Sequence, residues 1–78
     1  MQTMQVTIYD SESLKLYSDA IVSDDHGYLI PAHGMPQNDD LHDAIETSLM
    51  AYQDHGITTD SIHDYVSDSI THFWTITE

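Results

Sequence analysis

The feature that most constrains this chain is its almost complete lack of positive charge. Its 78 residues include one Lys and no Arg against 14 Asp plus Glu, so the formal net charge is −13 with the six His neutral. A folded chain of this size exposes roughly 4,800 Å², or about 370 Å² for each net negative charge. Self-repulsion at that density destabilises a compact state while keeping the chain soluble. Direct binding to DNA, RNA or an anionic membrane is strongly disfavoured, because Lys15 alone cannot neutralise phosphates.

The rest of the composition predicts one small folded domain that spans residues 1–78. Apolar residues make up 40% of the chain and include five Tyr, one Trp and one Phe, which favours a core of modest stability over disorder. The absence of Cys excludes disulfides, thiolate chemistry and Cys-based zinc sites. The chain starts without a signal-peptide pattern, and no apolar run approaches the roughly 20 residues of a membrane helix. We therefore expect a cytoplasmic protein with no membrane partner.

Alternating apolar and polar residues predict strands in the first part of the chain. Residues 4–9 have the period of a half-buried strand. In residues 14–23 the apolar side chains at even positions favour a second strand, but the segment also has helical spacing, and both interpretations remain open. The sequence Asp-Asp-His-Gly at 24–27 predicts a hairpin turn. A third strand is expected at 28–30, and Pro31 places it at an edge of the sheet.

Helical spacing occurs twice in the second part of the chain. The first predicted helix starts at Asn38 or Asp39, ends at Gly56 and buries one stripe of side chains, namely Leu41, Ala44, Ile45, Ser48, Leu49 and Tyr52. The second starts near Thr59 or Asp60 and buries Ile62, Tyr65, Val66 and Ser69. Residues 71–77 are rich in β-branched and aromatic side chains and predict a last strand. The expected fold is therefore α+β, with a small antiparallel sheet of about four strands and two helices packed on one face.

The carboxylates form three clusters, which we take as candidate partner-binding residues. They are Asp24 and Asp25 at the hairpin turn, Asp39, Asp40, Asp43 and Glu46 on the first helix, and Asp60, Asp64 and Asp68 on the second. Spacing of four places the last three about 6 Å apart along one helix face, comparable with the phosphate spacing along a DNA strand. Like charges this close cost a few tenths of a kcal/mol per pair, and no Lys or Arg offsets them. They fit a partner with a basic groove, although a solvated polar surface and adaptation to high salt are alternative explanations.

A very small, Cys-free, strongly acidic α+β chain with such clusters resembles the phage-encoded inhibitors of bacterial defence, which include anti-CRISPR proteins and DNA mimics. The likeness covers the general character of the whole chain and involves no motif. It implies a non-enzymatic inhibitor, working without cofactors in the cytoplasm of a host bacterium, that occupies the nucleic-acid groove of a nuclease or CRISPR-type complex. Known DNA mimics are often rich in Glu on long helices, whereas this chain has 11 Asp and three Glu.

Other chemistry has less support in the sequence. No two of the six His lie three or four positions apart, so we expect no metal site, and no nucleophile motif or phosphate loop indicates an enzyme. Tyr9, Tyr17 and Tyr28 are expected on the outer sheet face if even-numbered residues face the helices. An exposed Tyr-lined face or sheet edge also permits a homodimer. The alternative function is therefore a small antitoxin-like or homodimeric regulatory module whose acidity serves solubility.

Overall fold

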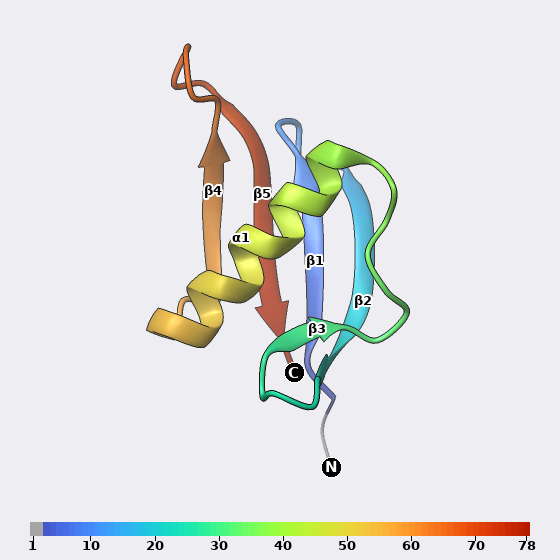
Figure 1. Cartoon of the computed structure of the whole chain (residues 1–78). Coiled ribbons are helices and arrows are strands. Elements are labelled where there is room, and N and C mark those ends of the chain that lie inside the picture. The colour runs from blue at the N-terminus through green and yellow to red at the C-terminus, as the bar shows by residue number, and fades with distance from the viewer. Residues whose placement is uncertain (1–2) are drawn as a thin grey trace.

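The computed structural model describes residues 3–78 as five strands and one helix (Figure 1). Met1 and Gln2, the first residues of the expected domain, lie outside the described residues. In chain order the elements are β1 (Gln5–Asp10), β2 (Lys15–Ser23), β3 (Leu29–Pro31), α1 (Asp39–His55), β4 (Thr59–His63) and β5 (Ile70–Thr77). The α+β class is confirmed, with five strands in place of about four and one helix in place of two. Within residues 3–78, no helix is long and apolar enough to cross a membrane.

All neighbouring strands are antiparallel, in the sheet order β3-β2-β1-β5-β4. The helix crosses one face of this sheet, and the sheet curls so that β3 lies on the same side as α1 (Figure 1). The loop between β4 and β5 extends beyond the rest of the molecule, at the top left of the view. The fold therefore has two layers, a helix and a curled sheet, and one sheet face has no helix on it.

The core lies between α1 and the two central strands. Val6 pairs with Ile76 across β1 and β5, and Ile8 pairs with Trp74, so four apolar side chains meet on the face towards the helix. Ile45 completes the core from α1 and is fully buried. Burying side chains of this size contributes roughly 1.5–3 kcal/mol each. This small core opposes the charge repulsion.

The helix begins and ends where the sequence predicts. The Asn38 side chain accepts a hydrogen bond of 3.1 Å from the backbone N–H of Leu41, which makes Asn38 the N-cap. Gly56 ends the helix in the left-handed conformation at φ 70°, a backbone geometry that costs glycine least. The predicted stripe faces the sheet, with Ala44, Ile45, Ser48 and Leu49 buried and its two outer members, Leu41 and Tyr52, partly buried.

The predicted second helix is wrong. Residues 59–63 form β4, residues 64–69 form a turn, and the chain returns as β5. The helical spacing of Ile62 and Val66 misled the prediction, because Val66 is 88% exposed at the turn and only Ile62 packs against the core. The physical reason is strand pairing: β5 needs a neighbour on its outer side, and β4 supplies it in register from Thr59 onward.

Residues 14–23 are resolved as a strand, because β2 covers Lys15–Ser23, and the hairpin turn and edge strand that follow are confirmed.

The expectation that even-numbered residues face the helix side holds in β1 but not in β2. A bulge after Ile8 shifts the register, so Tyr17 pairs with Ile8 and lies on the helix side. Tyr9 lies on the other side as expected, whereas Tyr28 precedes β3 and is 62% exposed.

The sheet side turned away from α1, here called the open face, follows from strand alternation. Its positions are Gln5, Thr7 and Tyr9 in β1, Lys15, Ser18, Ala20 and Val22 in β2, Ile30 in β3, Thr59 and Ser61 in β4, and Phe73, Thr75 and Thr77 in β5, and Leu16 is the extra residue of the bulge. These positions carry no carboxylate. The strand residues Asp10, Asp19 and Asp60 all fall on the helix side, where their register partners include the buried Val6 and Trp74.

Candidate functional site

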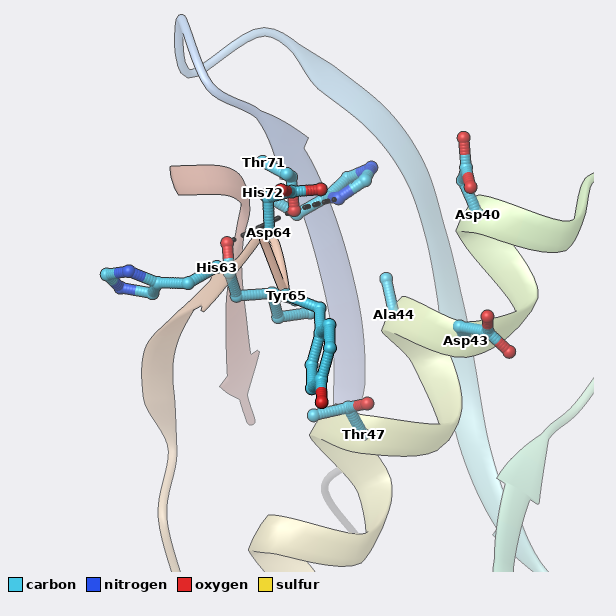
Figure 2. A pocket seen from close by; sticks show the side chains of 10 residues that line it. Asp40, Asp43, Ala44, Thr47, His63, Asp64, Tyr65, Thr71 and His72 are labelled. Carbon is cyan, nitrogen blue, oxygen red and sulfur yellow. Dashed lines mark hydrogen bonds between the residues drawn. The ribbon is translucent and has the colours of Figure 1, made fainter. Parts of the chain in front are cut away.

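An open cleft of about 390 Å³ lies between the first half of α1 and the β4–β5 hairpin. In Figure 2, Asp40 and Asp43 stand on the helix and Asp64 and Tyr65 on the hairpin across from them. We call these three aspartates and the space between them the acidic cleft. Two residues from one predicted cluster and one from another are therefore brought to the same cavity by the fold.

The helix presents Asp40 and Asp43 through its own register. Asn38 fixes the start of the helix, and Asp39 and Asp40 fall in its first turn, where the helix dipole favours negative charge. Because Ala44 and Ile45 face the core, Asp43 lies on the exposed side. These carboxylates are therefore held by a packed element at an exposed position.

The hairpin fixes Asp64 more tightly. One carboxylate oxygen, Oδ2, accepts hydrogen bonds from the backbone N–H of Val66 at 3.0 Å, the backbone N–H of Ser67 at 2.8 Å and the Ser67 hydroxyl at 3.0 Å. These bonds, with those from Ser67 the strongest, lower the pKa of Asp64 below its usual value. Asp64 therefore stays ionised while its other oxygen accepts none of the hydrogen bonds found within residues 3–78.

The hairpin tip adds apolar area beside the cleft. Tyr65 is fully exposed and Val66 is 88% exposed, immediately after the Asp64 carboxylate. Exposed aromatic side chains are frequent anchors of protein interfaces. The prediction that Tyr65 and Val66 belong to a core is wrong, and their place in the turn makes them accessible to a partner.

The structure corrects the predicted row of Asp60, Asp64 and Asp68. Asp60 lies in β4 opposite Trp74, whereas Asp64 and Asp68 stand at two places in the following turn. They share no helix face, so their even 6 Å spacing does not exist. Among the other candidates, Asp24 and Glu46 line a second groove, and Asp25 and Asp39 line neither cavity.

The second groove was not predicted from the sequence. It has about 400 Å³ between α1 and β3 and is mainly apolar, with Leu29, Met35 and Met50 among its lining side chains. Its carboxylates are Asp24 and Glu46. The signals available in the sequence were the apolar third strand and the methionines on either side of the helix start.

One group of side chains on α1 has the composition of a metal site. Ligand atoms of His42, Asp43 and Glu46 lie within 4.8 Å of one another, and His42 Nδ1 is 3.3 Å from Glu46 Oε1. The three side chains are partly or fully exposed on one helical turn. This arrangement follows from i,i+4 spacing and offers no enclosed coordination sphere.

A serine, a histidine and an aspartate also contact one another in turn. Ser61 Oγ is 3.0 Å from His63 Nε2, and His63 Nδ1 is 3.1 Å from the Asp68 carbonyl oxygen and 3.4 Å from its carboxylate. The Asp68 side chain is 92% exposed, so water solvates the carboxylate that a catalytic triad keeps buried. The His63 ring also points away from the cleft (Figure 2). These contacts hold the base of the hairpin and provide no enclosed site for a substrate.

Comparison of the chain with protein-family models, curated proteins and solved structures finds no match. The fold and the positions of the charged groups are therefore the basis of any functional assignment.

Proposed function

We propose that this protein is a non-enzymatic acidic binding protein that inhibits a basic, nucleic-acid-handling partner, a nuclease or a CRISPR-type complex, in the cytoplasm of a bacterial host. The observation that carries the proposal is the acidic cleft. Asp40 and Asp43 from the helix and Asp64 from the hairpin line the same open cleft. The only Lys, Lys15, begins β2, which β1 and β5 separate from β4. A basic groove meets these carboxylates without competition from cations of the same chain.

The mode of binding differs from that of an extended row of phosphate-like charges. The carboxylates come from two elements on either side of an open hollow, which suits a partner surface with several Arg or Lys side chains that reach them separately. Tyr65, which lines this hollow, and the exposed Val66 next to it in the turn add apolar contact that does not depend on salt. The partner surface that fits best therefore combines projecting cationic side chains with a nearby apolar pocket.

The proposal is tested by inhibition of purified nucleases and CRISPR-type complexes, measured over a series of NaCl concentrations. The test variant is the triple substitution Asp40→Asn, Asp43→Asn and Asp64→Asn, in which the new amide at position 64 retains an oxygen for the turn. The matched control is Glu12→Gln, Asp54→Asn and Glu78→Gln, which removes the same charge at exposed positions outside the cleft.

We expect the cleft variant to lose affinity and much of its salt dependence, while the control retains most of both. Equal loss in the two variants would assign the effect to overall charge and contradict a role for the cleft. Failure of the wild-type protein to inhibit any member of the panel would contradict the proposed class of partner.

A further inference from the structure

The open face is free of carboxylates in a chain with a net charge of −13. All three acidic residues that lie within strands are on the helix side, as are the cleft and its aspartates. The open face instead has the buried Thr7 with Thr75 and Ser18 around its centre, and Tyr9, Lys15 and Phe73 towards one end. Thr7 and Ser18 already satisfy each other with a hydrogen bond of 3.2 Å.

We propose that the open face is the contact surface of a homodimer, in which two copies pack sheet against sheet. Charge selects this occupant. Sheets packed face to face lie about 10 Å apart, which leaves both helices and their carboxylates on the outside of the dimer. The two acidic layers are then separated by both sheets, a distance greater than the Debye length of about 10 Å at 0.1 M salt.

The other surfaces of the chain bring like charges together. Pairing of two β4 edges places Asp60 of each copy near the other, and like charges across strands are destabilising. The opposite edge, β3, has three residues and includes Pro31, which cannot donate to a new strand pair. Contact through the helix layer brings the acidic faces of two α1 helices together.

The size of the open face predicts weak association. Four strands, β2, β1, β5 and β4, span roughly 19 Å at their usual spacing, and a length of about 20 Å gives on the order of 400 Å² in projection. Side-chain relief increases this area towards the roughly 800 Å² per partner of a standard interface. Val22 is 42% exposed and its register partner Ile30 is 39% exposed, so these two side chains supply unburied apolar area. We expect a dissociation constant in the micromolar range, on the order of 1–100 μM.

The dimer has a salt dependence opposite to that of the proposed function. Each copy carries a net charge of −13, so raising the salt concentration screens repulsion and strengthens dimerisation. The same change weakens binding of the acidic cleft to a basic partner. The two inferences can therefore fail separately.

The experiment is sedimentation equilibrium on the intact chain over a range of protein and NaCl concentrations, with folding checked by circular dichroism. Ser18→Asp places a carboxylate on the open face, and Ser23→Asp makes the same change on the same strand but on the helix side. Both serines are exposed. Val22→Ala, on the open face, is a second test variant that adds no charge.

We expect the wild type to approach twice its 8.8 kDa mass as its concentration rises, and to do so more readily at high salt. Ser18→Asp should weaken dimerisation roughly tenfold or more, Val22→Ala should weaken it severalfold, and Ser23→Asp should leave it within about twofold. A wild type that stays monomeric up to about 1 mM at high salt would overturn the inference. So would a dimer that tolerates Ser18→Asp, or one that both serine substitutions disrupt equally.

Discussion

His33 Nδ1 lies 2.6 Å from the Oδ1 atom of Asp19, and this contact joins the loop after β3 to the middle of β2. The Asp19 side chain is 8% exposed and its Oδ2 atom also accepts the backbone N–H of His33 at 2.8 Å. Burial raises the pKa of Asp19, but the hydrogen bonds from His33 and Ala20 outweigh burial and leave it below the usual value. The hydrogen bond to Asp19 raises the pKa of His33 in turn. Burial, with the charge of Asp19 beside its hydroxyl, raises the pKa of Tyr17 to about 12.

This pair predicts a pH window for stability. The raised pKa of His33 contributes stability that is complete below its usual value of 6.5 and is lost as the pH rises through the folded-state value. The lowered pKa of Asp19 contributes stability that is complete above its usual value of 3.8 and is lost as the pH falls through the folded-state value. The contribution of the pair is therefore greatest between about pH 4 and 6.5.

We expect His33→Asn to lower the melting temperature most at about pH 5.5 and least above pH 8. The matched control is His26→Asn, the same change in the exposed turn before β3. Thermal melts of the wild type, His33→Asn and His26→Asn between about pH 5.5 and 8 measure the effect. A wild-type minus His33→Asn difference that does not vary with pH would show that the ion pair contributes nothing.

The helix start gives a second prediction. Asn38→Ala removes the side-chain oxygen that accepts from the Leu41 N–H, so we expect a loss of about 1 kcal/mol in the free energy of unfolding. Asn38→Ser keeps an oxygen at the N-cap and should retain most of the stability. Urea denaturation of both variants measures the two values, and equal losses would indicate that capping does not determine this helix start.

The core gives a third. Ile45 is fully buried between α1 and the sheet, so Ile45→Val should cost about 0.5–1.5 kcal/mol and Ile45→Ala about 2–5 kcal/mol. The larger loss is comparable with the whole stability of a small domain, and we expect Ile45→Ala to be largely unfolded at 37 °C. Ile70→Val, at a side chain that is 39% exposed, is the control and should cost less than about 0.5 kcal/mol.

The contact between Ser61 and His63 gives a fourth. Because Asp68 is solvated and Ser61 lines neither of the two cavities described above, we expect hydrolysis of p-nitrophenyl acetate at about the rate of free imidazole at the same total concentration of imidazole groups. Ser61→Ala should leave that rate unchanged. A burst of p-nitrophenol from the wild type that Ser61→Ala abolishes would identify a nucleophile and contradict the proposed non-enzymatic role.

Local signals in the sequence were sufficient for much of the fold. Alternation located β1, Asn38 and Gly56 bounded the helix, and the Gly27 turn and Pro31 placed β3 at an edge. Each of these signals acts through the backbone of a few neighbouring residues. They are readable because no distant contact is needed to decide them.

The region after Gly56 depended on contacts that the sequence does not display. Ile62 and Val66 are spaced as on a helix, and only the pairing of β4 with β5 separates a buried Ile62 from an exposed Val66. The row of Asp60, Asp64 and Asp68 was predicted from the same wrong helix, and the structure therefore does not contain it. The acidic cleft could not be predicted either, because it depends on the angle at which α1 crosses the β4–β5 hairpin.

A substitution at Asp68 distinguishes the β4–β5 hairpin of the structure from the helix that the sequence predicted for this region. Its φ of 59° lies in the left-handed region, which glycine adopts at lower cost than aspartate. Its side chain is 92% exposed, and its carbonyl oxygen, which any residue retains, receives the 3.1 Å contact from His63 Nδ1. Asp68→Gly should therefore leave the stability of the hairpin unchanged or raise it by up to about 1 kcal/mol.

In a helix the same substitution would have the opposite sign, because glycine ranks below aspartate as a helix former and costs about 0.5–1 kcal/mol relative to alanine. Asp68→Ala is the matched control: alanine favours a helix and disfavours a positive φ, so it should destabilise the hairpin. Urea denaturation of both variants gives the order of their stabilities. A higher free energy of unfolding for Asp68→Gly than for Asp68→Ala supports the hairpin that places Asp64 at the cleft. The reverse order would favour the helix and its row of aspartates.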